Sequence, residues 1–296
     1  MTTAMTDLDP DRRTLMGLAY RMLGSVADAE DVVQEALVRW HRHPSPAAVE
    51  SPRAYLAQVT VRLCLDRLKS ARARREVYVG PWLPEPVLDT DGLRPADALS
   101  ELASDLSVAL LLTLERLSPL ERAAFILHDI FEMEWSDVAA TLGRTEAACR
   151  QLASRARVHI RDDRPRFRPS AEERERVLAA FAGAIATGDV SALSRLLAED
   201  AVFLSDGGGE VKAAIKPVKG RDRVARLLFG LHAKGLAEPG GYSFSAASIN
   251  GLPGFLVRSG ARRVETVALD LDGAGTITAV YAVSNPNKLR HIETSS

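Results

Sequence analysis

The chain has 296 residues and a formal net charge of −1 at pH 7, with 46% hydrophobic and 26% charged residues. This length is typical of two or three domains, and the composition is that of a soluble globular protein. The near-neutral charge excludes a uniformly basic nucleic-acid-binding surface, although a local basic patch is compatible with it.

The sequence shows no targeting, membrane or metal signal. The N-terminal segment MTTAMTDLDPDRR lacks the apolar core of a signal peptide, and no run approaches the ~18 apolar residues of a membrane span. The two cysteines, Cys64 and Cys149, provide neither a disulfide framework nor, by themselves, a metal cluster. We therefore expect a cytoplasmic chain that needs no metal or cofactor and binds no membrane.

Two helices are predicted near the N-terminus, from about Arg12 to Leu23 and from about Ala27 to Arg42. On one face of the second helix, Asp28, Asp31 and Glu35 follow one another at spacings of three and four residues. These acids are either a solvated face with favourable charge near a helix N-terminus or a docking surface for a basic partner.

A long basic helix is predicted next, with Ser51 as N-cap, Pro52 at its first position, and an end near Arg75. It holds seven basic residues and one acid, Asp66, in a chain that is nearly neutral. Such a helix suits contact with a nucleic-acid backbone, and the alternative is a solvated helix end. The basic residues are Arg53, Arg62, Arg67, Lys69, Arg72, Arg74 and Arg75.

Residues 77–105 contain several prolines and glycines and are predicted to be a linker. Within them, Trp82 and Leu83 stand beside the stiffening prolines Pro84 and Pro86. An exposed Trp-Leu pair is unfavourable in water, so we expect this segment to pack on another part of the chain. An exposed linker is the alternative.

Residues 135–161 are predicted to form a helix-turn-helix. The first helix covers Trp135–Leu142, Gly143 provides the left-handed corner, and the second helix runs from Thr145 to about Arg161. It follows a helix that begins with a capping box, Ser118 and Glu121. A plain surface helix hairpin is the alternative.

The second helix of this motif has two distinct faces, which is what a helix in the DNA major groove requires. One face is an apolar seam and the other carries arginines. The seam is Cys149, Leu152, Ala156 and Ile160, and the polar face is Arg150, Ser154, Arg157 and Arg161.

After a second proline-broken linker at residues 164–169, the pattern changes to helices followed by strands, which predicts an α+β cone with a curved antiparallel sheet. Helices are expected at 172–187, 190–197 and 222–234, and strands at 201–205, 211–218, 242–250, 254–258, 264–270 and 277–284.

These motifs, in this order, resemble an extracytoplasmic-function RNA polymerase sigma factor. ADAEDVVQEALVRW resembles the polymerase-binding helix of that family, and LCLDRLKSAR and LSPLERAAFILHDIF resemble parts of its regions 2 and 4. The C-terminal part resembles the SnoaL-like cone of the nuclear-transport-factor type. With WLPEP, DGGG and NPNKL, the chain is similar to the SigJ-type group, in which this cone is fused to the sigma domains.

The resemblance implies two all-α sigma domains, the second a helix-turn-helix, followed by the α+β SnoaL-like cone. The implied boundaries are 1–78 for region 2, 79–106 for the linker, 107–164 for region 4, and 165–296 for a regulatory domain. The implied partners are core RNA polymerase and promoter DNA, with no separate anti-sigma factor.

The resemblance also assigns roles to side chains. Those expected to face the polymerase are Asp28, Asp31, Gln34, Glu35 and Arg39. Those expected at the −10 element are Arg53, Arg62, Arg67, Lys69 and Arg72. Those expected at the −35 element are Arg144, Thr145, Arg150, Gln151, Ser154, Arg155 and Arg157.

A regulatory contact is expected between the linker, the triglycine turn and the C-terminal tail. Its members are Trp82, Leu83, Pro84, Glu85, Pro86, Asp206, Gly207, Gly208, Gly209, Asn285, Pro286, Lys288 and Leu289. Two positions depart from the family pattern: Glu210 stands where a lysine is usual, and Asn287 where an aspartate is usual. A salt bridge at either position is therefore expected to be missing or rewired.

Three functions are compatible with these observations. The leading one is a non-enzymatic transcription initiation factor that the cone modulates in cis. The second is a SnoaL-type enzyme or small-molecule sensor fused to a DNA-binding module, with Asp206, Asp222 and His232 as candidate bases. The third, a dimeric repressor, fits poorly with two separate DNA-binding segments in one chain.

Overall fold

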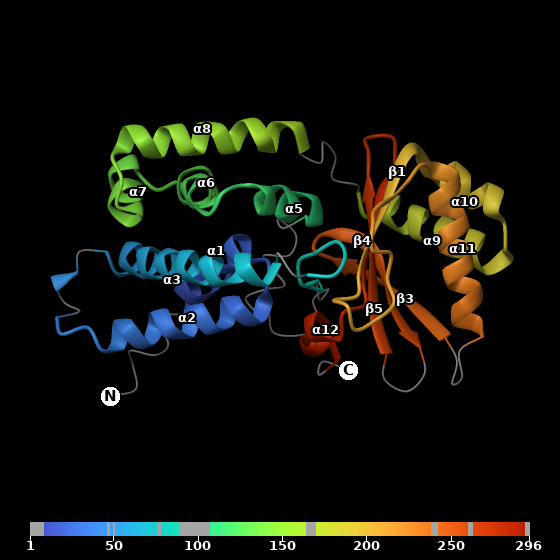
Figure 1. Cartoon of the computed structure of the whole chain (residues 1–296), viewed down its shortest axis with the longest axis horizontal. Helices are drawn as coiled ribbons and strands as arrows, with labels where there is room; N and C mark the ends of the chain where they lie inside the picture. The colour runs from blue at the N-terminus through green and yellow to red at the C-terminus, as the bar shows by residue number, and fades with distance from the viewer. Residues whose placement is uncertain are drawn as a thin grey trace. The chain divides into compact units, whose positions relative to one another are not determined.

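The computed structural model describes residues 9–45, 48–49, 51–75, 78–88, 107–163, 170–237, 242–259 and 263–293. They form two compact units: one contains the described residues up to 75 and 110–163, and the other contains 78–88, 107–109 and those from 170 onward (Figure 1). Residues 78–88, which lie within the linker predicted at 77–105, are therefore part of the C-terminal unit. The rest of the linker and residues 164–169 lie outside the described residues.

Three helices begin the first unit, and their ends follow local signals in the sequence. They are α1 (Asp9–Leu23), α2 (Val26–His41) and α3 (Pro52–Arg75). The hydroxyl oxygen of Ser25 accepts a hydrogen bond from the amide of Asp28, and that of Ser51 accepts one from the amide of Ala54. Both serines thus satisfy amides that would lack a partner in the first helical turn.

The helices that follow are α5 (Val108–Arg116), which belongs to the first unit from residue 110 onward, α6 (Pro119–Phe125), a π-helical turn η2 (Ile126–Ile130), α7 (Trp135–Leu142) and α8 (Glu146–Asp163). The predicted capping box of Ser118 and Glu121 is confirmed, and Gly143 takes the predicted left-handed conformation with φ of 61°. The predicted seam of α8 is buried as well.

The C-terminal unit is a six-stranded sheet with helices on both faces. Three helices cover one face, namely α9 (Ala171–Thr187), α10 (Val190–Leu196) and α11 (Arg221–Leu236) (Figure 1). The strands are β1 (Leu197–Asp206), β2 (Val218–Lys219), β3 (Tyr242–Ile249), β4 (Leu252–Ser259), β5 (Arg263–Leu271) and β6 (Ile277–Val283), in the order β2-β1-β6-β5-β4-β3.

Two strand predictions require correction. The sheet is mixed rather than antiparallel, because β1 and β6 pair in parallel at its centre. The strand predicted at 211–218 is reduced to Val218 and Lys219. Pro217 has no amide hydrogen for a strand ladder, and the carbonyl of Gly207 accepts hydrogen bonds from the amides of Glu210 and Val211, which turns the chain away from β1.

The two faces of the sheet bury different parts of the chain. On β1 and β6, Phe203 and Val280 belong to the core beneath α9 and α11. Because side chains alternate along a strand, Asp206 and Tyr281 point to the opposite face. Helix α12 (Pro286–Glu293) packs against β5. The bridge between Leu88 and Ile249 attaches segment 78–88 to the edge of the sheet.

A buried arginine links the helices of the first unit. Arg122 on α6 is 3% exposed, forms an ion pair with Glu115 at 2.7 Å, and donates a hydrogen bond to the carbonyl of Met22 on α1 at 2.5 Å. Burial lowers the pKa of Arg122 to about 10, so it remains charged at neutral pH.

We expect Arg122→Met to lower the free energy of unfolding of the first unit by about 3–5 kcal/mol, because it leaves a carboxylate and a carbonyl without their buried partner. Arg39→Met is the control, since Arg39 pairs with Glu35 on the surface, and an exposed pair contributes less than about 1 kcal/mol. Urea titration followed by far-ultraviolet circular dichroism measures both. Equal destabilisation by the two variants would contradict this role of Arg122.

Candidate functional site: the Asp206 clasp and the charged helix faces

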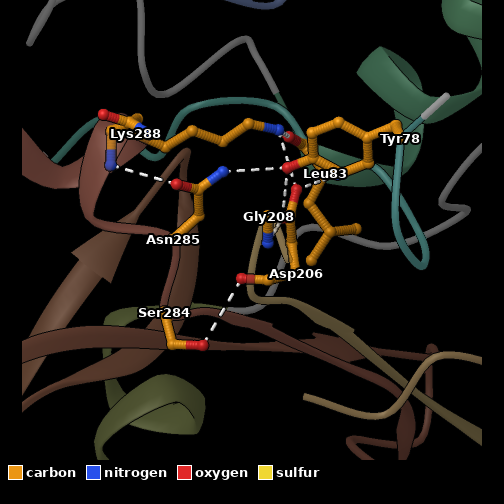
Figure 2. Close-up of polar contacts among 8 residues, drawn as sticks. Tyr78, Leu83, Asp206, Gly208, Ser284, Asn285 and Lys288 are labelled. Atoms are coloured by element: carbon orange, nitrogen blue, oxygen red, sulfur yellow. Dashed lines mark hydrogen bonds and ion pairs between the residues drawn. The ribbon is translucent and has the colours of Figure 1, made fainter. Parts of the chain in front are cut away.

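The Asp206 side chain is completely buried and accepts four hydrogen bonds (Figure 2). Its Oδ1 atom accepts from the hydroxyl of Tyr78 at 2.5 Å and the amide of Gly208 at 3.0 Å. Its Oδ2 atom accepts from the amide of Leu83 at 2.8 Å and from Nζ of Lys288 at 2.7 Å. These donors occupy the acceptor capacity of a carboxylate. We call Tyr78, Leu83, Asp206, Gly208, Asn285 and Lys288 the Asp206 clasp.

Lys288 is the cation of the clasp and comes from α12. Only 7% of the residue is exposed, and its Nζ atom also donates to the carbonyl of Leu83. The same atom lies 4.2 Å from the centroid of the Trp82 ring and 5.2 Å from that of Tyr78. A buried ammonium requires an opposite charge and several acceptors, and here the linker segment provides both a carbonyl and two aromatic faces.

Tyr78 is held in its protonated form. Burial, followed by the hydrogen bond to Asp206, raises the pKa of Tyr78, because a phenolate would be poorly solvated and would lie beside a carboxylate. The Nδ2 atom of Asn285 donates to the Tyr78 oxygen at 2.9 Å. Tyr78 therefore joins the end of β1 to the residue that precedes α12.

The glycines of DGGG are required by close approach. A Cβ atom on Gly208 would lie 2.2 Å from the Asn285 side chain, and one on Gly207 would lie 2.2 Å from the carbonyl oxygen of Val211. Gly208 and Gly209 also have φ values of 63° and 79°, which other residues rarely adopt.

Segment 78–88 is also bonded to the C-terminal unit at its far end. The amide of Val87 donates to Oδ1 of Asn250 at 3.1 Å, and the amide of Asn250 donates to the carbonyl of Val87 at 2.8 Å. The ring of His291 is hydrogen-bonded through Nε2 to the carbonyl of Pro86 at 2.7 Å. Sequence reasoning missed Tyr78, Asn250 and His291, since no local pattern marks these long-range partners.

The other predicted members of the regulatory contact lie in or beside this clasp. Pro84, Glu85, Pro86 and Leu289 are buried, but Trp82 is only half-buried while Leu83 is fully buried. The pair therefore packs on the C-terminal unit as expected, with the leucine more deeply buried than the tryptophan.

The two positions that depart from the family pattern contact each other. The Nδ2 atom of Asn287 donates to Oε1 of Glu210 at 2.6 Å. A hydrogen bond between an amide and a carboxylate therefore connects the triglycine turn to α12 in this chain.

On α2, the predicted polymerase-facing residues are arranged as an exposed strip. Asp31, Gln34, Glu35 and Arg39 are exposed, while Asp28 is half-buried. Arg39 pairs with Glu35 at 2.9 Å. This is the arrangement that a docking surface needs.

Two of the −10 candidates on α3 contact other helices of the first unit. Arg67 forms ion pairs with Asp28 and Asp31, and Arg62 donates to the carbonyls of Ala140 at 3.1 Å and Thr141 at 3.4 Å, near the end of α7. The remaining candidates are Arg53, which is exposed, Lys69, which pairs with Asp66 on the surface, and Arg72, whose side chain is outside the described part of the chain.

The −35 candidates divide into three groups. Arg155 pairs with Glu121 and Arg157 with Asp129, so these arginines tie α8 to the preceding helices. Arg150 pairs with Glu146 and stands over the Trp135 ring, whose centroid lies 5.4 Å from the guanidinium carbon. The exposed candidates Arg144, Thr145, Gln151 and Ser154 complete the set.

The candidate bases of the cone do not share one site. A cavity of about 450 Å³ lies on the helix-covered face, and His232 lines it, but neither Asp206 nor Asp222 does. Asp206 points to the opposite face, and Asp222 accepts a hydrogen bond from Ser194 at 3.4 Å. Among the described residues, no cluster of three potential metal ligands occurs, and no helix is both long and apolar enough to cross a bilayer.

Comparison with known proteins identifies two sigma-factor regions in the chain. The model of Sigma-70 region 2 matches residues 9–74, and that of Sigma-70 region 4 matches residues 107–160. The ECF RNA polymerase sigma factor SigJ of Mycobacterium tuberculosis (strain ATCC 25618 / H37Rv) is 38% identical over 96% of this chain and 92% of its own length.

Two further similarities also extend over nearly the whole chain. A probable ECF RNA polymerase sigma factor SigI of Mycobacterium tuberculosis (strain CDC 1551 / Oshkosh) is 34% identical over 94% of this chain and 92% of its own length. The crystal structure of the Mycobacterium tuberculosis extracytoplasmic function sigma factor SigJ superposes with a TM-score of 0.77 and 36% identity, covering 97% of this chain and 98% of that one.

We expect Asp206→Asn to lower the free energy of unfolding of the C-terminal unit by about 3–5 kcal/mol, because an ammonium is left without its buried carboxylate. The new amide NH2 would also face two of the four donors of the clasp. Thermal unfolding of the full chain measures the loss. A variant as stable as the parent would show that the clasp contributes little to folding.

Asp270→Asn is the matched control, since Asp270 is also a buried aspartate of the sheet, hydrogen-bonded to Tyr281. Burial raises the pKa of Asp270 above 3.8. Its protonated form therefore favours the folded state, and this contribution is lost as the pH rises from about 3.8 through the raised pKa. We expect Asp270→Asn to remove that decline and to leave stability at pH 7 unchanged or higher.

Proposed function

The chain belongs to the family of extracytoplasmic-function RNA polymerase sigma factors, and we propose that its SnoaL-like cone controls the sigma domains in cis through segment 78–88. Sigma factors bind core RNA polymerase and direct promoter recognition. The observation that carries the proposal is the Asp206 clasp, which bonds the start of the connection between the two sigma regions to the cone.

The clasp limits the distance that the connecting chain can span between sigma regions 2 and 4. Residues 78–106 join α3 to the α5 region, and residues 78–88 are bonded to the cone. A fully extended chain spans at most ~3.3–3.6 Å per residue. Residues 89–106 can then bridge at most roughly 60 Å, so release of the clasp lengthens the separation available to the two promoter-reading parts.

We propose that three helices of the sigma domains bind different partners, within the domain boundaries predicted from the sequence. The exposed strip of α2, containing Asp31, Gln34, Glu35 and Arg39, binds core polymerase. The basic residues of α3 engage the −10 element, and α8 reads the −35 element. Gln151 and Ser154, both exposed, are the proposed base contacts, and Arg144 is a proposed phosphate contact.

Binding to promoter DNA requires Arg62 and Arg67 to exchange partners. Arg62 would leave the carbonyls of Ala140 and Thr141, and Arg67 would leave Asp28 and Asp31. The partly exposed ion pairs of Arg67 contribute little free energy, and a phosphate offers each arginine a comparable contact. Release of Asp28 and Asp31 would at the same time make both acids available to the polymerase.

A regulatory cone fits the clasp better than an enzyme does. The Asp206 oxygens are saturated by donors from the chain, so this carboxylate has no vacant site at which to accept a substrate proton.

Because the cone is covalently attached, it takes the place of a separate anti-sigma factor in this proposal. The site of action is wherever core polymerase is present, which is the cytoplasm. A dimeric repressor would use neither the α2 strip nor the clasp.

Promoter-dependent transcription with purified core polymerase tests the proposal. We expect Asp206→Asn and Trp82→Ala each to raise transcript yield at least about fivefold, the lower range of a typical coupling free energy. Deletion of residues 285–296, which removes Lys288, should act in the same direction. Asp270→Asn on the same sheet is the control and should leave the yield unchanged.

Other outcomes are equally informative. Unchanged yield for all clasp variants would contradict control by the cone, and a fall in yield would show that the clasp assembles the active form instead of restraining it. The absence of transcripts with any core polymerase, from the parent chain and all variants, would favour the fused enzyme or sensor.

A further inference from the structure

The cone contains a cavity that the clasp does not use. It has a volume of about 450 Å³, within the ordinary range for small-molecule sites. Four phenylalanines contribute to its wall, from α9 and from strands β1, β3 and β4: Phe181, Phe203, Phe244 and Phe255. The Phe181 and Phe255 rings are stacked at 5.5 Å, and Phe244 meets Phe255 edge-on at the same distance. Such walls suit a flat apolar molecule.

The charged groups of the cavity are mainly cationic. Lys212 and Lys234 line it and are exposed, so they lie at its open side, together with the exposed Leu231. His232 and one carboxylate, that of Glu265, complete the ionisable lining. Two lysines against one acid favour an anionic group on the molecule that enters.

We propose that this cavity binds a small, largely aromatic molecule that carries one anionic group, and that its occupation is transmitted to the Asp206 clasp. The binding step stands independently of the proposed function, whereas its regulatory consequence rests on control of the sigma domains by the cone.

At the end of β1 and directly after β6, a residue that lines the cavity is followed by a residue of the clasp. Ser205 lines the cavity and Asp206, the next residue, holds the clasp; Ser284 lines the cavity and is followed by Asn285 of the clasp. Adjacent residues of a strand point to opposite faces. Figure 2 shows Ser284 on the side of Asp206 away from Tyr78, and its hydroxyl lies 3.4 Å from the Asp206 carbonyl.

A loop provides a second connection. Residues 211–214 form part of the cavity wall, and this loop starts at the glycine turn of the clasp. The amides of Glu210 and Val211 donate to the carbonyl of Gly207, and a Cβ atom on Gly207 would lie 2.2 Å from the Val211 carbonyl oxygen. A ligand that displaces the loop therefore moves the turn that positions Gly208 beneath Asp206.

Fluorescence titration of the full chain with two matched probes tests the site. The probe 1-anilinonaphthalene-8-sulfonate combines aromatic rings with one sulfonate, and N-phenyl-1-naphthylamine has the same rings without it. We expect saturable binding of one molecule of either probe per chain, with tighter binding of the sulfonate. Equal affinity for the two probes would overturn the anionic part of the proposal.

Two sets of variants locate the binding. Ala182 lines the cavity, so Ala182→Phe should fill it and weaken both probes at least about tenfold, whereas Ala186→Phe, one turn further on the exposed side of α9, should not. The double variant Lys212→Ala, Lys234→Ala should weaken the sulfonate by roughly threefold to tenfold and leave the uncharged probe unaffected. Full affinity of Ala182→Phe would show that the probes bind elsewhere.

Hydrogen exchange with the sulfonate probe tests the transmission. The Leu83 amide donates a hydrogen bond to Asp206. We expect the probe to change the hydrogen-exchange rate of this amide in the parent chain but not in the Ala182→Phe variant. Probe binding without a change in this exchange rate would contradict the coupling between the cavity and the clasp, while the binding site itself would stand. Transcription that is insensitive to Asp206→Asn would instead contradict the proposed function, and the two failures are distinguishable.

Discussion

The C-terminal unit depends on one buried negative charge. A carboxylate without access to water is tolerated only where donors surround it, and the donors around Asp206 come from three places in the chain: Tyr78 and Leu83 upstream of the second sigma region, Gly208 in the adjacent turn, and Lys288 in the last helix. The segment between the two DNA-reading regions therefore cannot leave the cone without exposing or stranding this charge. The cone is therefore bonded to the segment between the two sigma regions and is not merely joined to the end of the chain.

The first unit follows a related logic with weaker bonds. Arg67, a predicted DNA contact, neutralises Asp28 and Asp31, which are predicted polymerase contacts. Each of these pairs is partly exposed, so each exchanges readily for an external phosphate or a basic protein surface. The buried pair of Arg122 and Glu115 differs in kind, because it has no solvent-exposed alternative. Rigid and exchangeable charges are thus separated within one helical unit.

Local signals made much of the fold predictable. The N-cap at Ser51, the capping box at Ser118 and the corner at Gly143 depend on neighbours within four residues, and all three predictions are confirmed. The parallel pairing of β1 with β6 depends on residues about eighty positions apart and was not predicted. The prediction of a strand at 211–218 was wrong for all but its last residue, because the apolar pattern does not reflect that Pro217 has no amide hydrogen for a strand ladder.

The candidate site was predictable in its members but not in its chemistry. The motifs pointed to Asp206 and Lys288, yet DGGG by itself indicated only a turn. The hydrogen bond from the Leu83 amide to Asp206 spans 123 residues and leaves no periodic trace in the sequence. Tyr78 was missed for the same reason. Trp82 and Leu83 were expected to pack as a pair, but Leu83 is fully buried while Trp82 is half-buried, with the ammonium of Lys288 4.2 Å from the centroid of its ring.

The contact between Glu210 and Asn287 has a consequence for exchanging parts between relatives. The triglycine turn and the tail meet as a matched pair of side chains. A chimera that takes its turn from this chain and its tail from a relative with aspartate at the second position would oppose two carboxylates across a short gap. A chimera of the reverse kind would oppose an amide to a lysine. The turn and the last helix must therefore be exchanged together, although the two contacting residues are 77 positions apart in the sequence.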